Sequence, residues 1–213
     1  MNGTEAQRAE KETARLEAFS DGVFAIAITL LILEIKVPHA TGDTSLWAAL
    51  AGLWPSYLAF ALSFFVILIM WVNHHELMRL VRGVNYPFLF ANGLVLATVS
   101  FVPFPTAVLA EHLGTHEAGP AVAFYCATFI INSLAWGVLY WTIGRAKLLR
   151  HDVDPGTMGR IHRAYVAGQA VYVVSTLVAF RWPWVGLGLN ASLWILWIGL
   201  SYRTQVEVAT HKG

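Results

Sequence analysis

The fold of this chain is decided near its N-terminus by the stretch Arg15-Leu-Glu-Ala-Phe-Ser-Asp-Gly-Val-Phe-Ala-Ile-Ala-Ile-Thr-Leu-Leu-Ile-Leu-Glu-Ile-Lys-Val37. Residues 18–37 form an apolar run of about 20 residues, which at roughly 1.5 Å per residue is long enough to cross a hydrocarbon core of about 30 Å. Asp21 lies inside this run, and an ionisable group within a membrane span is costly and indicates a functional site. The stretch therefore predicts a membrane-spanning helix with a functional role.

One stripe of this predicted helix carries most of its large apolar side chains. At about 100° per residue, a single set of residues shares one face. The set comprises Arg15, Phe19, Gly22, Ile26, Thr29, Leu30, Leu33 and Val37. Ser20 and Asp21 fall off the stripe, so we expect them to face a neighbouring helix. The wheel leaves two interpretations open: the stripe lines a water path on a shared axis, or it is an ordinary packing face.

The polar entrance to this helix carries a recognisable motif. The string Arg15-x-x-x-Phe19-Ser20-Asp21, followed at once by an apolar span that contains Thr29, resembles the signature of the transmembrane protein 175 family. This family comprises a lysosomal potassium channel and its bacterial relatives. The resemblance would cover essentially the whole chain, and it identifies the chain as a bacterial member of the family.

The resemblance carries implications for assembly and for the pore. It implies a subunit with six transmembrane helices that forms a homotetramer, in which the first helix of each subunit lines the pore. By position after the motif, the pore constrictions would fall on Ile26, then on Thr29 or Leu30, and then on Leu33. These four residues already share the stripe that the helical wheel defines.

Composition places the chain in a membrane independently of any motif. Hydrophobic residues make up 57% of the 213 residues and charged residues only 13%, whereas soluble domains carry about 25% charged residues. The net charge of +1 argues against a nucleic-acid-binding surface. The single cysteine, Cys126, excludes an intrachain disulfide and a metal site built on cysteines. We expect no cofactor and no bound metal, with K⁺ as the permeant ion that the resemblance implies.

Six apolar segments can be drawn along the chain, which forms a single domain, 1–213. They cover residues 18–37, 57–72, 88–109, 121–143, 164–180 and 185–202. All but two of the 14 lysine and arginine residues, Lys36 and Arg181, fall on one side of this arrangement. The positive-inside rule then places both termini in the cytoplasm, with residues 1–17 as a charged cytoplasmic segment. We expect an all-α integral membrane protein with no removable signal peptide.

Prolines predict two interruptions in these segments. Trp54-Pro55 separates a short interfacial turn from the second span, because proline disfavours helix in the residue before it. Pro103 and Pro105 lie in the outer half of the third span, where they bend or end a regular helix. A structural bend is the simpler interpretation, and a functional hinge is the alternative.

Polar residues of the first three spans fall at one depth near the cytoplasmic end. We expect Ser20, Asp21, His74 and Asn92, with Arg15 beside them, to form a hydrogen-bonded layer that holds the first helix, because buried polar groups in lipid need partners. The resembled family implies a similar network. Direct ion binding by Asp21 is the alternative.

Histidines near the end of the second span suggest two further interpretations. His74 or His75 would either sense pH, because imidazole titrates in the physiological range, or simply form hydrogen bonds. The pair His75-Glu76 resembles the start of a zinc-protease helix, but Arg79 stands where the second histidine ligand belongs. The obvious enzyme motif is therefore rejected.

The residues alone indicate a membrane protein with six spans and a functional first helix, and the family resemblance implies a modestly potassium-selective ion channel in a bacterial cell membrane. No Thr-Val-Gly-Tyr-Gly carbonyl filter is present, so selection would rest on rings of side chains that also form a hydrophobic gate. The expected partners are further copies of the chain, K⁺ and other monovalent cations, and membrane lipid, with no nucleic acid. The alternative is a proton-coupled secondary transporter that uses Asp21 and His74 as a proton relay.

Overall fold

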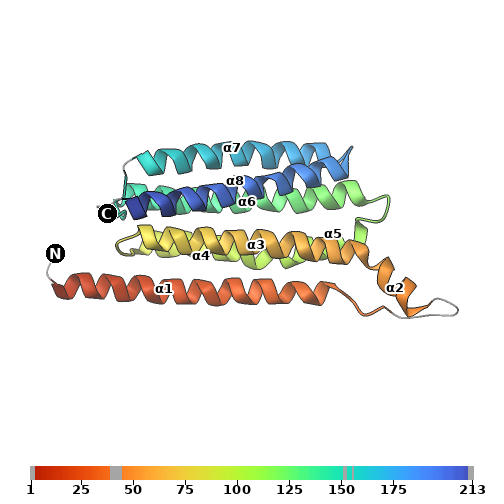
Figure 1. The fold of residues 1–213 in the computed structure, drawn as a ribbon, viewed down its shortest axis with the longest axis horizontal. Coiled ribbons are helices and arrows are strands. Elements are labelled where there is room, and N and C mark those ends of the chain that lie inside the picture. The colour runs from red at the N-terminus through yellow and green to blue at the C-terminus, as the bar shows by residue number, and fades with distance from the viewer. Residues whose placement is uncertain (1–2, 39–44, 151–152, 155, 211–213) are drawn as a thin grey trace.

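The computed structural model is an all-helical bundle whose long helices run along a common axis (Figure 1). It describes residues 3–38, 45–150, 153–154 and 156–210. The helices are α1 (Gly3–Leu30), the 3₁₀ helix η1 (Leu31–Glu34), α2 (Leu46–Gly52), α3 (Trp54–Leu80), α4 (Tyr86–Phe101), α5 (Pro103–His112), α6 (Ala118–Arg145), α7 (Gly156–Ala179) and α8 (Pro183–Thr210). The predicted all-α class is confirmed.

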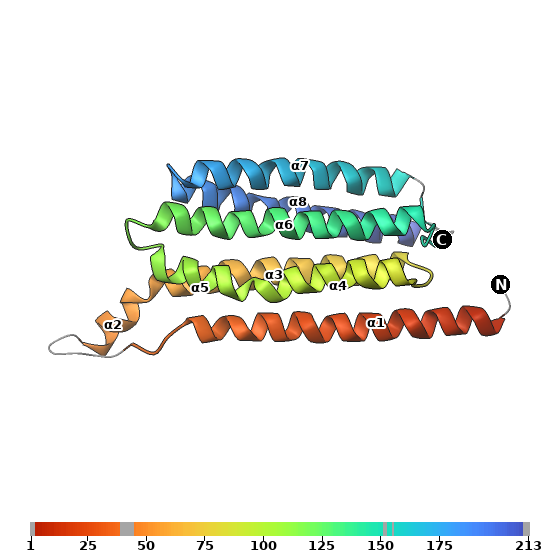
Figure 2. The same cartoon turned by 180° about the vertical axis from the view of Figure 1, so that it is seen from behind.

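The helices form three groups across the bundle. α1 lies along one edge, α3 and the α4–α5 pair lie in the middle, and α6, α7 and α8 form the opposite side (Figures 1 and 2). α1 packs against α3 and α4, and η1 packs against α3 and α5. α1 is therefore covered on one side only, and the described subunit leaves its other side open.

α1 begins well before the predicted membrane span. The charged N-terminal residues are rich in alanine, glutamate, lysine and arginine, which favour helix, so they continue the apolar run as one helix. At its other end the α-helix tightens into η1, and the chain leaves η1 at Ile35 in an extended conformation. Pro38 follows, and proline restricts the residue before it to extended conformations.

The first predicted interruption lies between α2 and α3. Ser45 caps α2 by accepting a hydrogen bond from the backbone N–H of Ala48 at 3.2 Å. α3 begins at Trp54, with Pro55 in its first turn, where the missing N–H of proline costs nothing. The interruption before the second span is confirmed, and the segment that precedes it is a short helix where a turn was expected.

The second predicted interruption separates α4 from α5. α4 ends at Phe101 and α5 begins at Pro103, where the N–H of Val102 bonds the carbonyl of Val99 at 3.1 Å in a tightened turn. Ser63 of α3 lies 2.6 Å from the hydroxyl of Thr106 in α5 and 3.2 Å from that of Tyr125 in α6. These buried hydroxyls fasten the bent segment to its neighbours, which supports a structural bend.

Four helical stretches of the described residues are long and apolar enough to cross a membrane. They are Gln7–Glu34, Trp54–Leu80, Tyr86–His112 and Ala118–Arg145, and Pro183–Gly199 is a shorter apolar stretch. Each predicted span overlaps one helical segment of the structure. The predicted span 164–180 lies in α7, which is not one of these four stretches, and the first turns of α7 carry Arg160 and Arg163. The start of α1 and the end of α8 lie at the same end of the bundle (Figure 1).

Close contact between α7 and α8 generates a prediction about stability. A Cβ atom on Gly186 would stand 2.7 Å from the Ala179 side chain and 2.7 Å from the carbonyl oxygen of Ser175, whereas one on Gly188 would meet nothing within 4 Å. Gly186→Ala is expected to lower the free energy of unfolding by about 1 to 3 kcal/mol, because overpacking forces the helices apart. The thermal midpoint of the purified protein in detergent measures this, and Gly188→Ala is the control. Equal midpoints for the two variants would contradict the close approach.

Candidate functional site

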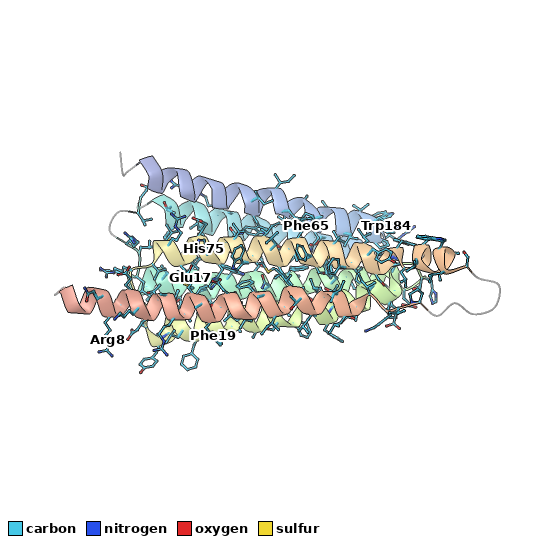
Figure 3. The ribbon with its side chains drawn as sticks, turned by 60° about the horizontal axis from the view of Figure 1, so that its bottom comes forward. Arg8, Glu17, Phe19, Phe65, His75 and Trp184 are labelled. Carbon is cyan, nitrogen blue, oxygen red and sulfur yellow. The ribbon has the colours of Figure 1, made fainter. Side chains whose placement is uncertain are left out.

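The four residues predicted to line a pore lie on the uncovered side of α1 and η1. The side chains of Ile26, Leu30 and Leu33 are 61%, 42% and 59% exposed, and Thr29 is exposed as well. Phe19 continues the same face toward the N-terminus and points away from the bundle (Figure 3). Within one subunit these apolar side chains face outward, as apolar side chains of other helices such as Ile131 and Ile195 also do, so they are placed to meet lipid or another subunit.

The opposite face of α1 and η1 is buried against the bundle. Ser20, Phe24, Ala27 and Leu31 are all buried, at successive spacings of four, three and four residues. This spacing follows one side of a helix, and that side meets α3 and α4. The rotation of α1 about its own axis is therefore fixed, and Ile26 and Leu33 face outward as a result.

The hydroxyl of Thr29 is oriented by its own helix. Its oxygen lies 3.0 Å from the carbonyl oxygen of Ala25 and 2.9 Å from that of Ile26. The hydroxyl proton therefore points back along the helix, and the oxygen lone pairs face away from it. Among the apolar side chains of this face, Thr29 presents an acceptor oxygen to whatever approaches α1.

A buried hydrogen-bonded chain links α1 to α4 and α3. The Ser20 hydroxyl donates to the carbonyl of Leu16 at 2.9 Å and accepts from the amide nitrogen of Asn92 at 3.0 Å. The amide oxygen of Asn92 lies 2.8 Å from His74 Nε2, which must carry the proton because that oxygen accepts. Ser20, Asn92 and His74 are thus brought together, as the sequence predicts.

The His74 ring is enclosed by apolar and aromatic neighbours. Its centroid lies 5.4 Å from that of Phe24 and 6.1 Å from that of Trp136. The second ring nitrogen, Nδ1, is buried and has no hydrogen-bond partner among the described residues. His74 therefore connects three helices: α1 through Phe24, α4 through Asn92 and α6 through Trp136.

Asp21 belongs to a second set of contacts between α1 and α3. Its carboxylate accepts a hydrogen bond from the indole nitrogen of Trp71 at 2.9 Å, so it does not join the chain through Asn92. One turn away, Glu17 lies 2.8 Å from Nδ1 of His75 (Figure 3). The rings of Trp71 and His75 are stacked with centroids 6.2 Å apart. The predicted single layer is therefore divided into two.

Trp71 and the Glu17–His75 pair are contacts that the sequence analysis does not predict. Tryptophans near span ends are common enough in membrane proteins that Trp71 gives no sign of a specific bond. The available signal is spacing: Glu17 and Asp21 are four residues apart on α1, and Trp71 and His75 are four apart on α3. Such pairs share one face of each helix, so two facing pairs can meet.

Arg15 lies apart from both polar sets. Its side chain is exposed, and it takes no part in the bonds that join Ser20, Asn92 and His74 or in the bond from Trp71 to Asp21. Together with Phe19 it lines a groove of about 730 Å³ between α1 and the start of α4. The remaining lining residues are Glu12, Leu16, Val84, Asn85, Tyr86 and Leu89. Within the single subunit Arg15 does not join the buried layer, and its expected place beside that layer stays a prediction for the assembled protein.

The described residues offer no obvious metal centre. In the segments 3–38, 45–150, 153–154 and 156–210, no three histidine, cysteine or acidic side chains gather closely enough to hold an ion. Cys126 is buried in α6. The candidate site therefore consists of the hydrogen-bonded side chains between α1, α3 and α4 and of the uncovered face of α1.

The fold and this site define an all-helical membrane protein with one edge helix left open, and comparison with known proteins gives its family. The profile of the family described as "Endosomal/lysosomal potassium channel TMEM175" matches residues 15–103. Potassium channel Cha6605_3372 of Chamaesiphon minutus is 45% identical over 84% of this chain and 90% of its own length. Potassium channel B446_29190 of Streptomyces collinus is 46% identical over 79% of this chain and 83% of its own length. The chain belongs to the TMEM175 family, which is a family of ion channels.

A solved structure and a eukaryotic relative extend the comparison. The crystal structure of a lysosomal potassium-selective channel TMEM175 homolog from Chamaesiphon minutus matches with a TM-score of 0.78 and 41% sequence identity, covering 90% of this chain and 98% of that one. The endosomal/lysosomal proton channel TMEM175 of Homo sapiens is 33% identical over 78% of this chain but only 35% of its own length. Relatives named for K⁺ and for H⁺ thus share this helical unit.

The buried hydrogen bonds that join Ser20, Asn92 and His74 generate a prediction about stability. Asn92→Leu is expected to lower the free energy of unfolding by about 1 to 3 kcal/mol, because Nε2 of His74 would be left buried without an acceptor. The thermal midpoint in detergent measures the loss. Ser100→Leu is the matched control, since Ser100 is an exposed residue on the same helix. If Asn92→Leu were as stable as Ser100→Leu, the hydrogen bonds of Asn92 would contribute nothing to the stability of the fold.

Proposed function

We propose that this chain is a subunit of a homotetrameric, modestly potassium-selective channel in a bacterial cell membrane. Six helical segments span the membrane: α1 with η1, α3, α4 with α5, α6, α7 and α8. Both termini lie in the cytoplasm. Four α1 helices surround the pore, with the rings of Ile26, Thr29, Leu30 and Leu33 facing its axis.

The observation that supports this proposal most directly is the division of α1 into two faces. The inward face is buried by packing and hydrogen bonds, while the outward face keeps Ile26 and Leu33 about 60% exposed. A helix at the edge of a subunit, with an apolar outer face interrupted by one hydroxyl, is suited to line an axis shared with other copies. The bacterial relatives named as potassium channels support the identity of the ion.

Selection in such a pore follows from dehydration. A ring of isoleucine or leucine side chains offers no ligands to a cation, so the ion must shed water to pass. K⁺ sheds its water more readily than Na⁺, and the ring therefore favours K⁺. The four Thr29 oxygens, whose lone pairs face away from α1, replace part of the lost hydration. The same rings close the pore when they approach closely enough to exclude water.

The polar contacts of α1 then have a positioning role. Asp21 with Trp71, and Ser20 with Asn92, set the rotation of α1 and therefore the direction in which Ile26 points. These residues touch no ion in this mechanism. Their removal would alter the pore by turning or loosening α1.

Ile26→Ala tests the pore. Removing the larger side chain widens the ring, so we expect a larger unitary K⁺ conductance and a K⁺/Na⁺ permeability ratio that falls toward unity. Single-channel recordings of the purified protein in planar bilayers with K⁺ and Na⁺ gradients measure both quantities. Ile131→Ala is the matched control, because Ile131 is 60% exposed but lies on α6. Unchanged conductance and selectivity in Ile26→Ala would contradict the pore-lining role.

A second candidate function is proton-coupled transport through Asp21 and His74. The unpartnered Nδ1 of His74 is the observation that favours it. Against it, Asp21 bonds Trp71 while His74 bonds Asn92, so no hydrogen bond of the described residues joins the two groups of the relay.

Asp21→Asn separates the two functions. An asparagine oxygen still accepts from Trp71, but the side chain no longer titrates, so the channel mechanism predicts K⁺ currents close to those of the wild type. A proton-coupled transporter would lose its flux. Liposome flux under separate K⁺ and pH gradients makes the distinction, because a K⁺ channel reverses with the K⁺ gradient and not with the pH gradient.

A further inference from the structure

The geometry points to Lys36 as a residue that limits cation passage at the mouth of the pore where α1 and η1 end. Its ammonium group is held on the carbonyl of Leu33 at the end of the pore-lining segment, where it opposes the entry and exit of K⁺. This inference rests on the proposed function, since it adds a determinant of conductance to the pore that α1 forms.

A direct contact holds Lys36 in place. Its Nζ atom donates to the carbonyl oxygen of Leu33 at 2.7 Å. Leu33 belongs to the face proposed to line the pore, and both side chains are exposed. The ammonium therefore lies within one turn of Leu33, a residue of the proposed constriction.

The carbonyl that Lys36 caps is one that would otherwise attract cations. The last carbonyls of a helix lack partners within the helix, and the helix dipole places partial negative charge there. In this segment the carbonyl of Ile32 accepts from the backbone N–H of Ile35 at 3.1 Å, and Lys36 takes the next one. With four chains around an axis, four such carbonyl groups would surround the mouth.

The neighbouring charges decide whether removing the charge of Lys36 raises or lowers the conductance. In residues 31–38, Glu34 and Lys36 are the two charged side chains, and Glu34 is half-buried. Removing the charge of Lys36 leaves the carboxylate of Glu34 and the helix terminus, both of which favour cations. The local K⁺ concentration at the mouth rises, and the conductance rises with it.

Lys36→Gln tests this directly, because glutamine keeps an N–H donor but has no charge. At about 0.1 M KCl we expect a unitary K⁺ conductance about twofold above that of the wild type, and the difference should narrow at about 1 M, where the Debye length falls from about 10 Å to about 3 Å. Lys36→Arg should resemble the wild type. Arg181→Gln is the matched control: Arg181 lies at the same end of the bundle, between α7 and α8, where it stacks on Trp182.

A second measurement varies the charge at position 36 within one variant, by attaching a negative or a positive group to a cysteine. In the variant Lys36→Cys, the only other cysteine of the sequence is Cys126, which is buried. Charged methanethiosulfonate reagents would therefore modify position 36, where the thiol forms a mixed disulfide and a sulfinate is released. The expected order of conductance is highest with a negative adduct, intermediate without one and lowest with a positive adduct. This comparison is made on channels that have already assembled.

The outcomes are distinct. Equal conductance of wild type and Lys36→Gln at low salt, or an equal rise in Arg181→Gln, would overturn the role of Lys36. If Ile26→Ala still alters the currents, the proposed pore stands without it. A wild-type protein that carries no K⁺ current would overturn both the pore and this inference.

Discussion

The hydrogen bonds that join α1 to α3 and α4 are the constraint on which the rest of this structure depends. Inside an apolar bundle the hydroxyl of Ser20 and the amide of Asn92 must satisfy each other, since unpaired polar groups there are costly. Turning α1 by one residue, about 100°, would move Ser20 out of reach, and in one of the two directions it would carry Ile26 toward the bundle. The buried polar face therefore determines which apolar residues face outward.

This arrangement separates the task of folding from the task of permeation. Phe24 and Leu31 pack the inward face of α1, so Ile26 and Leu33 are not needed to hold the subunit together. In the proposed channel, such side chains can change without unfolding the protein, and the ion that passes can change with them. The relatives fit this picture, because proteins named for K⁺ in bacteria and for H⁺ in vertebrates resemble the same helical unit. The fold alone therefore does not identify the ion.

Much of the fold could be predicted from local properties of the sequence. Apolar length located the helices, and Pro55 and Pro103 located both interruptions, because their effects act within a few residues of the chain. The start of α1 was missed because charged and apolar residues can form one continuous helix, and hydropathy registers only the apolar part. In the candidate site, depth along the spans brought Asn92 and His74 together correctly. The bond from Asp21 to Trp71 was missed, because it depends on the rotation of two helices at once.

The sequence by itself determined that the chain is helical and apolar enough for a membrane, that its first span carries one stripe of large apolar side chains, and that its motif belongs to a channel family. These features follow from composition, period and short-range order. Only the tertiary structure decided that the stripe faces outward, that Ser20, His74 and Asn92 meet while Arg15 stands apart, and that the ammonium of Lys36 is held on the carbonyl of Leu33. Most of these relations join residues distant in sequence, and the packing of α1 against α3 and α4 sets which groups come within hydrogen-bonding distance.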